Sequence, residues 1–512
     1  MMVLETCELN ARLVHRPINK CTFDEGLLDA QPPRHAKGDA EPSPSHAAAA
    51  VRQKPLAPQR LGSFGAEPLG FAAHRPYGYA RVEPEPLCIQ NSPIKCTLIY
   101  WTVHSYMSVP TSIVETQTEA LRVLCRELVP ANSFYTPRIQ AAGFDVDRLT
   151  LETFTELIPF TTRDEWVRDQ LDHPPYGTNL TYSLDRYVRF CRTSGSTGHA
   201  MTWLDTPESW DAQLNCWARV YEVAGVTQPH RIFFAFSFGP FLGFWTAYDA
   251  ATKLGHLPIP GGGLSSAARL QLMIDTQAEV LCCTPTYALR LAQVAGQEGI
   301  RVDDTAIRTI IVAGEPGGSI ASTRSRISQA WSGARVFDHH GMTEVGPVSY
   351  ACPAEPDVLH VMEDTYFPEV VDNELILTTL TRSGSPLLRY RTGDVVQAER
   401  RSPCACGSHE LSLVGGIRGR TDDMVVVRGV NVFPSAIEKI VRATNGVNEY
   451  EVHITTHHEM VELMIKIEGD EKARSELSAA LENRLTLRIP VEIAPTGSLP
   501  RYEMKAKRWI TK

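Results

Sequence analysis

The 512-residue sequence contains no apolar run long enough to span a bilayer. Its most apolar stretch, residues 232–245, is shorter than the ~20 residues that a membrane-spanning helix requires. The N-terminal residues also lack the positive charges followed by an apolar core that mark a secretory signal. We therefore expect a cytoplasmic protein without stable membrane insertion.

The sequence also lacks an excess of positive charge. It has 50 Lys and Arg against 59 Asp and Glu, which gives a net charge of −9. Nucleic-acid binding requires a concentrated basic face, so we expect no nucleic-acid partner, although a local phosphate pocket is not excluded. The cysteine count is 12, scattered along the chain. In a long cytoplasmic protein most cysteines are buried thiols or metal ligands rather than disulfides.

Residues 1–95 differ in composition from the rest of the chain. Proline, alanine and glycine are frequent there, and no helical or strand period is sustained. This composition predicts a disordered N-terminal extension, because such a segment buries too little apolar surface to fold. A targeting segment and a wrongly assigned start codon are alternatives that the sequence leaves open.

Regular apolar periodicity begins near residue 110. The first helical face is predicted from Ala120, Leu121, Val123, Leu124 and Leu128. Farther on, the expected strands are 232–236, 280–283, 309–313 and 375–380, and the expected helices include 207–223 and 265–276. This alternation predicts an α/β fold with buried sheets, and we assign residues 110–420 to one large domain.

The composition changes again near residue 420. The segments that follow predict strands at 424–427, 449–455 and 461–467, a turn at Gly429, and helices at 435–444 and 472–485. A unit of this length is sufficient for a small domain. We therefore expect residues 421–512 to form a compact α+β domain.

A hydroxyl- and glycine-rich run follows an apolar-aromatic segment near residue 190. Its residues are Thr193, Ser194, Gly195, Ser196, Thr197 and Gly198. Glycines allow close approach of the backbone, and hydroxyls with exposed amides can bind phosphate oxygens. The run fits neither the P-loop, which needs a following Lys, nor a GxSxG nucleophile elbow. Taken alone, it is better explained as an exposed Ser/Gly turn.

Several further motifs follow this run in a fixed order. They comprise 313–316 (Ala-Gly-Glu-Pro), 339–344, 390–394, 404–407, 419–423, 428–434 and 499–505. Together they resemble the adenylate-forming superfamily of acyl-CoA ligases, luciferases and nonribosomal peptide adenylation domains. Within it, residues 112–512 are most similar to the phenylacetate-CoA ligase group. The resemblance implies a large N-terminal α/β domain of adenylate-forming enzymes with a small mobile α+β C-terminal lid.

The resemblance also implies an activity. ATP would activate a carboxylic acid to an acyl-adenylate, with Mg²⁺, and coenzyme A would then take the acyl group as a thioester. Two anions must meet in the first step, so positioning and charge neutralisation would carry the catalysis. The alternatives are transfer to a carrier protein or an amine, and a catalytically silent nucleotide-binding protein.

The resemblance assigns roles to individual residues. The run 193–198 would hold the β- and γ-phosphates, Thr343 the α-phosphate and Glu344 the Mg²⁺. Lys505 would stabilise the forming acyl-phosphate bond, although Lys507 and Arg508 belong to the same basic cluster. The nucleoside would be bound by Gly314, Glu315, Pro316 and His340 at adenine, Asp394 at the ribose hydroxyls, and Arg420 at ribose or phosphate. Asp422 matches the hinge between the domains.

Two positions depart from the family pattern. His199 follows the phosphate loop where a Lys or Arg is usual, so phosphate binding there is weaker or depends on pH. His340 replaces a Tyr or Phe, and an imidazole can still stack on adenine. Neither change removes a group without which the chemistry fails.

A metal site is predicted from cysteine and histidine in the same region. Cys352, His360, Cys404 and Cys406 offer three thiolates and one imidazole, a set that suits tetrahedral structural zinc. Some members of the resembled group carry such a site. His409 is a competing ligand, and free cysteines in a loop are the simpler alternative.

The acid pocket is expected in residues 236–245, with 260–263 beside it. The aromatic character of this segment favours an apolar or aromatic acid, although core packing explains the same aromatics. Gly243, Phe244 and Trp245 depart from the phenylacetate pattern, which puts phenylacetate itself in doubt. The identity of the acid and the oligomeric state, for which a homodimer is one candidate, are left open by the sequence.

Overall fold

The computed structural model describes residues 109–193, 200–401, 403–427, 430–457, 460–502 and 506–511. The chain divides into two units, Met1–Leu87 and Cys88–Lys512, and every described residue lies in the second. The predicted N-terminal extension, residues 194–198 of the predicted phosphate loop, the following His199 and Lys505 lie outside the described residues.

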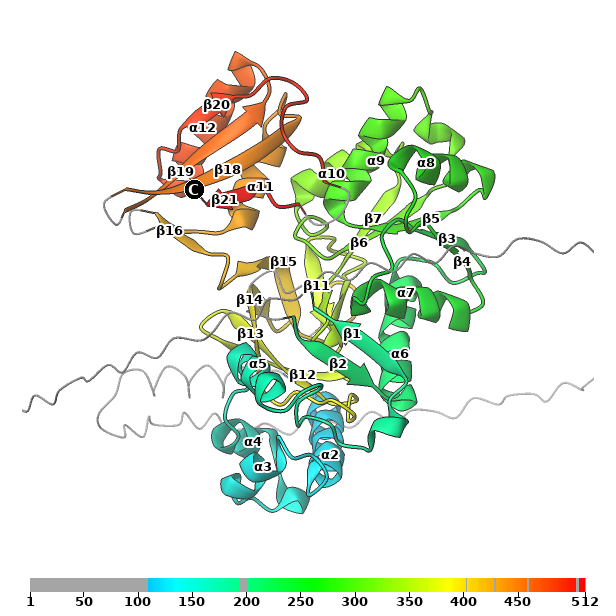
Figure 1. Ribbon diagram of the computed structural model, residues 1–512, viewed down its shortest axis with the longest axis vertical. Helices are drawn as coiled ribbons and strands as arrows, with labels where there is room; N and C mark the ends of the chain where they lie inside the picture. Colours follow the sequence, from blue (N-terminus) through cyan, green and yellow to red (C-terminus); the bar gives the residue numbers. More distant parts are fainter. Residues whose placement is uncertain are drawn as a thin grey trace, which may run out of the picture. The chain divides into compact units, whose positions relative to one another are not determined.

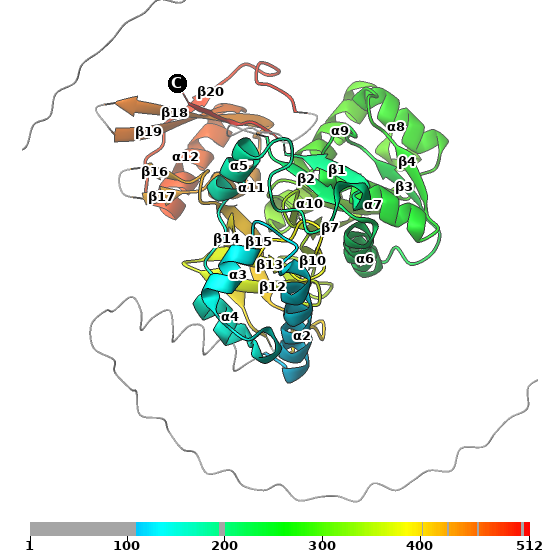
Figure 2. The same cartoon turned by 60° about the horizontal axis from the view of Figure 1, so that its bottom comes forward.

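A group of short helices opens the described chain. Its members are α2 (Thr111–Leu128), α3 (Thr136–Ala142), the 3-10 helix η1 (Val146–Arg148), α4 (Leu151–Leu157) and α5 (Arg163–Asp172). The predicted face of α2 is confirmed for Leu121, Leu124 and Leu128, which are buried, but Val123 is 45% exposed. Val123 lies two positions from Leu121, which turns its side chain toward the opposite face of the helix. Figure 2 shows α2, α3 and α4 beside β12 and β13.

A five-stranded parallel sheet forms the centre of the α/β part. Its order is β4-β3-β5-β6-β7, and each strand pairs in parallel with its neighbours. The bounds are β3 (Arg231–Phe234), β4 (Leu257–Pro260), β5 (Val280–Cys283), β6 (Thr309–Ala313) and β7 (Arg335–His339). Every residue of β5 and β6 is buried, as continuous apolar runs in a sheet covered on both faces require.

Helices cover both faces of this sheet (Figure 1). They are α6 (Pro207–Val223), α7 (Leu242–Lys253), α8 (Ser266–Asp275), α9 (Pro285–Gln297) and α10 (Ala321–Ala330), with 3-10 turns η2 (Leu184–Arg186) and η3 (Val302–Asp304). Residues of α6 and α7 pack against Ile232 and Phe234, whereas α8, α9 and α10 pack against Phe233. The two sets therefore lie on opposite faces, because alternate residues of a strand point to opposite sides. The α/β class predicted from the sequence is confirmed.

A second sheet is antiparallel and has six strands, in the order β10-β11-β15-β14-β13-β12. The bounds are β10 (Ser349–Ala351), β11 (Val358–Val361), β12 (Tyr366–Val371), β13 (Glu374–Thr379), β14 (Tyr390–Glu399) and β15 (Ser412–Arg420). Two short hairpins accompany the sheets, formed by β1 (Arg189–Arg192) with β2 (Thr202–Asp205) and by β8 (Gly341–Met342) with β9 (Gly346–Pro347). The strand predicted at 375–380 is β13.

The last part of the chain has its own apolar core. It contains β16 (Val425–Val427), β17 (Val430–Val432), α11 (Pro434–Ala443), β18 (Glu449–His457), β19 (Met460–Glu468), α12 (Glu471–Leu485), β20 (Val491–Ile493) and β21 (Trp509–Thr511). Its four-stranded sheet has the order β20-β19-β18-β21, and α11 and α12 pack on it through Ile437 and Leu477. These elements match the α+β unit predicted from the sequence. Across the described residues, every helix is too short or too polar to traverse a bilayer.

Candidate active site

A cavity of about 710 Å³ lies beyond the carboxyl ends of β6 and β7. Its volume is in the range of small-molecule sites, about 300–1,000 Å³. The carboxyl ends of parallel strands are also where open α/β sheets bind ligands. The cavity is lined by six of the nucleoside-binding residues expected from the sequence, namely Gly314, Glu315, Pro316, His340, Asp394 and Arg420.

The segment after β6 turns sharply into the cavity wall. Gly314 has φ +93°, a backbone conformation that residues with a Cβ rarely adopt. The Glu315 carboxylate is held on both oxygens. Its Oε1 accepts from the backbone N of Thr286 at 2.8 Å, and its Oε2 accepts from the backbone N of Ala506 at 3.0 Å. Glu315 therefore joins the start of α9 to the C-terminal segment at the edge of the cavity.

The segment after β7 presents two histidines with different surroundings. His339 is buried beside Trp217, and its Nδ1 lies 2.6 Å from the Ser349 carbonyl oxygen. Burial lowers the pKa of His339 to about 4, so its imidazole is neutral at pH 7. His340 instead lines the cavity and lies 2.9 Å from Asp394, measured from Nε2 to Oδ2.

Asp394 is the carboxylate around which this part of the cavity is organised. It is 4% exposed and lies on β14 opposite Arg420 of β15. Arg420 donates from Nη1 to Asp394 Oδ1 at 3.2 Å and from Nε to Asp422 Oδ1 at 2.8 Å. Burial disfavours the charge of Arg420, but Asp422 and Asp394 outweigh burial and raise its pKa. One guanidinium thus links the expected ribose ligand to the expected hinge residue.

Thr343 and Glu344 lie in the turn between β8 and β9 and are half-buried. Burial raises the pKa of the Glu344 carboxyl, and Arg420 partly offsets this effect. A bound cation would favour the charged form of such a carboxyl. The backbone of this turn is held by Arg382, which donates to the carbonyl oxygens of Thr343 at 3.2 Å and Glu344 at 2.7 Å.

Arg382 is in turn held by a buried ion pair that the sequence analysis missed. Its Nε and Nη2 donate to the two carboxylate oxygens of Asp205 at 2.6 and 2.7 Å. Arg382 is 2% exposed and Asp205 is fully buried. Neither residue belongs to a motif, and 177 positions separate them. No signal in the sequence indicates this pair.

The predicted phosphate loop connects β1 to β2. Of its six predicted residues only Thr193 is described. Thr193 donates from its backbone N to the Met201 carbonyl oxygen at 2.9 Å, and its Oγ1 accepts from the Met201 N at 2.9 Å. These bonds close the base of the loop.

The C-terminal segment reaches the same cavity directly after the candidate lysine. Lys505 lies outside the described residues, whereas Ala506, Lys507 and Arg508 line the cavity. Arg508 is paired with Glu449 at 2.8 Å, so its charge is already neutralised. Lys507 stays open as the alternative to Lys505.

The cysteines and histidine of the predicted metal site come together from two loops and β11. The ligand atoms of Cys352, His360, Cys404 and Cys406 all lie within 4.8 Å of one another. Cys352 Sγ lies 3.7 Å from Cys404 Sγ, and Cys406 Sγ lies 3.3 Å from His360 Nε2. The 3.7 Å separation excludes a disulfide, whose sulfurs are about 2.05 Å apart. Among the described residues, His409 is not part of this group.

The aromatic segment expected to bind the acid packs beside β3. Phe236 is buried. The ring centroid of Phe238 lies 4.8 Å from that of Trp245 and 5.3 Å from that of Tyr248. Phe238, Phe244, Trp245 and Tyr248 are only partly buried, and Met342 of the nucleotide cavity packs on the same core. The aromatic segment and the cavity are therefore neighbours.

Comparison with known proteins agrees with this geometry. Residues 429–512 match the family model described as the AMP-binding enzyme C-terminal domain. The chain is 29% identical over 416 residues to phenylacetate-coenzyme A ligase of Pseudomonas putida, spanning 76% of this chain and 92% of the relative. It is 28% identical over 419 residues to phenylacetate-coenzyme A ligase of Escherichia coli, spanning 77% and 93%.

A solved structure is similar to this chain in fold and in sequence. It is 2-hydroxyisobutyryl-CoA ligase in the postadenylation state, with a TM-score of 0.73 and 26% identity over 78% of this chain and 89% of that chain. Over about three quarters of its length this chain is therefore similar to phenylacetate-coenzyme A ligases and to a solved coenzyme A ligase, and its C-terminal part matches the AMP-binding enzyme model.

The sequence analysis missed several residues that hold the cavity walls in place and belong to none of the motifs. Besides Asp205 and Arg382, it missed Asp338 on β7, which accepts from the backbone N of Ser319 at 2.7 Å. Gly318 is required beside it, because a Cβ there would lie 2.5 Å from Asp338 Cγ. The only sequence signal for this contact was the glycine pair after the Ala-Gly-Glu-Pro motif.

We expect the Asp205–Arg382 pair to show strong coupling. Arg382→Met would leave the Asp205 charge buried without a partner, at a cost of about 3–5 kcal/mol in the free energy of unfolding. The double variant Asp205→Leu with Arg382→Met removes both charges and should recover part of this loss. Urea unfolding of the single and double variants measures the coupling.

An exposed pair provides the control for this cycle. Arg488 and Glu482 are 85% and 50% exposed and lie 2.8 Å apart, so Arg488→Met should cost less than about 1 kcal/mol. Equal, additive losses at Asp205 and Arg382 would contradict the pairing.

Proposed function

We propose that this protein activates a carboxylic acid with ATP to an acyl-adenylate and then transfers the acyl group to coenzyme A. The observation that carries the proposal is the single cavity that gathers the expected adenine and ribose ligands, Arg420 and the C-terminal segment around residue 506. The relatives named above are coenzyme A ligases, and the solved neighbour was captured with an acyl-AMP.

The two half-reactions balance without an external oxidant or reductant. A carboxylate oxygen attacks the α-phosphorus of ATP, the bond to the bridging oxygen breaks, and pyrophosphate leaves. The thiolate of coenzyme A then attacks the acyl carbonyl, and AMP leaves. Both steps bring anions together, so the protein must position them and neutralise charge in a site that excludes bulk water.

The nucleoside would be oriented by groups that the fold already holds rigid. Asp394, fixed by His340 and Arg420, would accept the ribose hydroxyls, because a carboxylate offers about four lone-pair sites. The segment Gly314, Glu315 and Pro316 would line adenine. His340, which directly follows β7, would stack its imidazole ring on the adenine base.

The phosphates would be held between the loop after β1 and the turn after β8. Thr193 and the loop residues to Gly198 would bind the β- and γ-phosphates, and Thr343 the α-phosphate. Glu344 fits a magnesium ligand, because its half-buried carboxyl has a raised pKa that a cation would lower. Magnesium supplies positive charge that offsets the phosphate oxygens.

Lys505 would stabilise the charge that develops between acid and α-phosphate. The bond from Ala506 N to Glu315 supports this assignment, since it fixes the residue next to Lys505 at the cavity edge. We assign residues 110–420 to the adenylation domain and 421–512 to a mobile lid that hinges at Asp422. Lid motion would exchange Lys505 for the thiol of coenzyme A between the two steps.

The acid would lie against Phe238, Phe244 and Trp245 and would be apolar or aromatic. The part-burial of these rings beside Met342 supports this assignment. The observation fits aryl acids in general and names no particular one. A cytoplasmic location and a homodimer stay predictions.

The cysteine and histidine group fits a structural zinc ion. Ligands 2.3 Å from a tetrahedral zinc are about 3.8 Å apart between sulfurs, and the Cys352 and Cys404 sulfurs are 3.7 Å apart. Ser412 Oγ lies 3.4 Å from His360 Nδ1 and would orient the ring, as outer hydrogen bonds do around zinc. Zinc would tie β11 to the loop before β15.

The function predicts acid-dependent pyrophosphate release. A panel of aryl and aliphatic acids should give release with ATP, with the best rates for aryl acids, and AMP formation should turn over only with coenzyme A. Lys505→Ala should slow adenylation by about 100-fold or more with an unchanged Tm, because it removes one positioned charge. Lys472→Ala, on the exposed face of α12, is the matched control and should be neutral.

Other outcomes would assign a different reaction. ATP binding without pyrophosphate release from any acid would identify a silent nucleotide-binding protein. Turnover with an amine or a carrier protein in place of coenzyme A would identify the alternative acceptor. Full activity of Lys505→Ala would move the catalytic assignment to Lys507.

Asp394→Asn tests the ribose contact. The neutral Asn amide cannot accept the charge-assisted hydrogen bonds that the carboxylate accepts, which are worth about 1.5–3 kcal/mol. The KM for ATP should therefore rise about 10- to 100-fold. The KM for the acid should change much less, because the acid does not contact the ribose. Asp211→Asn, at an exposed pair with Lys253, should leave both constants unchanged. An unchanged KM for ATP in Asp394→Asn would remove Asp394 from the site.

The zinc assignment predicts one zinc ion per chain by elemental analysis. Cys404→Ser should lower the zinc content severalfold and lower the Tm, because it removes one of four ligands. The control variant Cys125→Ser replaces a buried cysteine of α2 and should keep one zinc ion per chain. Metal-free protein with the same Tm as the purified form would contradict the assignment.

A further inference from the structure

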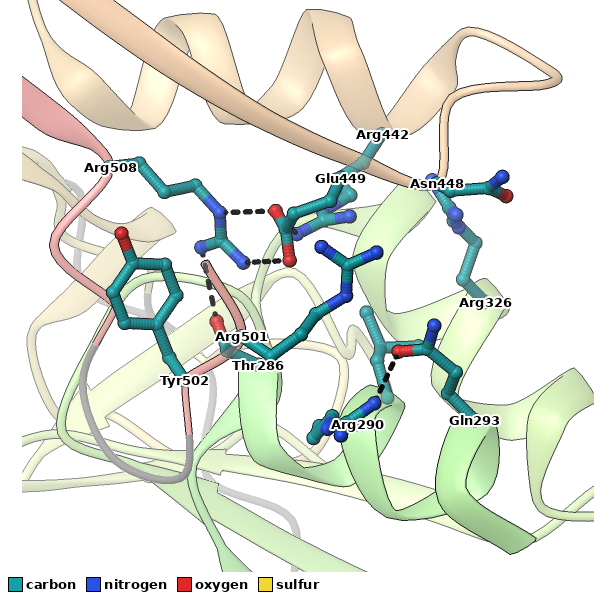
Figure 3. A pocket seen from close by; sticks show the side chains of 11 residues that line it. Thr286, Arg290, Gln293, Arg326, Arg442, Asn448, Glu449, Arg501, Tyr502 and Arg508 are labelled. Carbon is teal, nitrogen blue, oxygen red and sulfur yellow. Dashed lines mark hydrogen bonds and ion pairs between the residues drawn. The ribbon is translucent and has the colours of Figure 1, made fainter. Parts of the chain in front are cut away.

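A second cavity, of about 180 Å³, has five arginines among its eleven lining residues. They are Arg290 of α9, Arg326 of α10, Arg442 of α11, and Arg501 and Arg508 of the C-terminal segment. Among the described residues that line it, Glu449 is the only one with a carboxylate. Figure 3 shows these side chains around one space. We call this cavity the arginine pocket.

Three of the five guanidinium groups are neutralised by carboxylates. Arg442 donates to Glu438 at 2.7 Å, Arg508 donates to Glu449 at 2.8 Å, and Arg501 lies 2.6 Å from Glu468. These pairs fix the three groups in place, because each guanidinium is bound through hydrogen bonds as well as charge. Their positive charges are therefore already balanced.

Arg290 and Arg326 have no carboxylate within 4 Å among the described residues. Arg290 donates to Gln293 at 3.0 Å, and its Nε is buried without a hydrogen-bond partner in this part of the chain. Arg326 donates only to the Val447 carbonyl oxygen, at 3.2 Å, among the bonds described. Burial, and then the neighbouring charge of Arg442, lowers the pKa of Arg326.

Two positive charges thus share a partly buried pocket without counter-ions. Partly buried like charges repel more strongly than they do in water, and a buried donor without an acceptor carries a further cost. The pocket also has room for more than a water molecule, which needs about 10–15 Å³. A small anion with several oxygens would relieve both costs, because guanidinium groups bind phosphate oxygens in pairs.

We propose that the arginine pocket is a binding site for a phosphate group, with Arg290 and Arg326 as its two free ligands. Gln293, Asn448 and Tyr502 add polar groups to the same wall. The pocket shares Thr286 and Arg508 with the nucleotide cavity, and Arg508 Nη1 lies 3.3 Å from Thr286 Oγ1. The site is therefore adjacent to the nucleotide but separate from the groups assigned to it.

A phosphate group here would act on the arrangement around the catalytic lysine. The phosphate group would contact arginines of α9 and α10 and polar groups of the segment after residue 441. Ala506 belongs to the same segment and donates from its backbone N to Glu315. A ligand that binds only one arrangement favours that arrangement by its binding free energy. Phosphate binding would thus favour the placement in which the C-terminal segment lies on the nucleotide cavity.

Thermal unfolding in phosphate-free buffer tests the site directly. Inorganic phosphate titrated to 10 mM at constant ionic strength should raise the Tm by about 1–3 °C and saturate, as specific binding does. Generic stabilisation by phosphate grows steadily toward much higher concentrations and does not saturate in this range. Isothermal titration calorimetry provides the binding constant. Neither measurement needs acid, ATP or activity, so the result stands apart from the proposed function.

The variants Arg290→Gln and Arg326→Gln, alone and combined, should lose the saturable shift. Arg301→Gln removes an exposed arginine just beyond α9, 74% exposed, and should keep it. Arg326→Lys keeps one charge and should keep part of the shift, which guards against loss of folding in the glutamine variants. A wild-type shift no larger than that from chloride, or a shift unchanged in the double variant, would overturn the proposal.

The same assay identifies the source of the phosphate group, and only here does the inference rest on the proposed function. Pyrophosphate, coenzyme A and dephospho-coenzyme A are compared in wild type and in the Arg290→Gln, Arg326→Gln double variant. A shift from coenzyme A that exceeds that of the dephospho form, and is lost in the double variant, assigns the site to the 3′-phosphate. A Tm shift from pyrophosphate that is lost in the double variant assigns the site to pyrophosphate, the product of adenylation. Both results support the site.

Discussion

The buried pair of Asp205 and Arg382 is the constraint on which the active-site turn depends. Arg382 uses two nitrogens for the carboxylate and the third for the carbonyl oxygens of Thr343 and Glu344. One guanidinium therefore ties β2, at the foot of the phosphate loop, to the turn expected to meet the α-phosphate. A buried pair of this kind is costly to form, and its role here is geometric, because it fixes β2 and the turn between β8 and β9 relative to each other.

The nucleotide cavity repeats the same design with carboxylates that would meet a ligand. Asp394 lies within β14 and Glu315 lies just after β6, and both have their oxygens engaged by groups of other elements. A carboxylate held on two sides keeps one orientation, so little conformational freedom is left to lose when a nucleotide binds. The rigid neighbours thus matter as much as the carboxylates that a motif identifies.

The arginine pocket shows the opposite situation. There the positive groups are placed by helices of the large α/β part and by the C-terminal segment, and the charge is left partly unbalanced. Like charges held together in a partly buried region raise the free energy of the folded protein, which points to a ligand that offsets this cost. Titratable groups with perturbed pKa values in a cleft point to function for a similar reason. The group of Cys352, His360, Cys404 and Cys406 is also gathered by the fold, with its ligand atoms within 4.8 Å of one another.

Local patterns in the sequence were enough to predict the α/β architecture, the ordered motifs and the group of three cysteines and one histidine that the structure brings together. Apolar runs such as 280–283 predict buried strands because their period is local, and motif residues such as Asp394 are read from their neighbours in the chain. Only the folded structure shows that His340 contacts Asp394, that Asp205 pairs with Arg382, and that arginines from α9 to the segment before β21 line one pocket. These contacts join residues 54 to more than 170 positions apart. No local pattern encodes such a pairing, because it arises only when separately formed elements pack together.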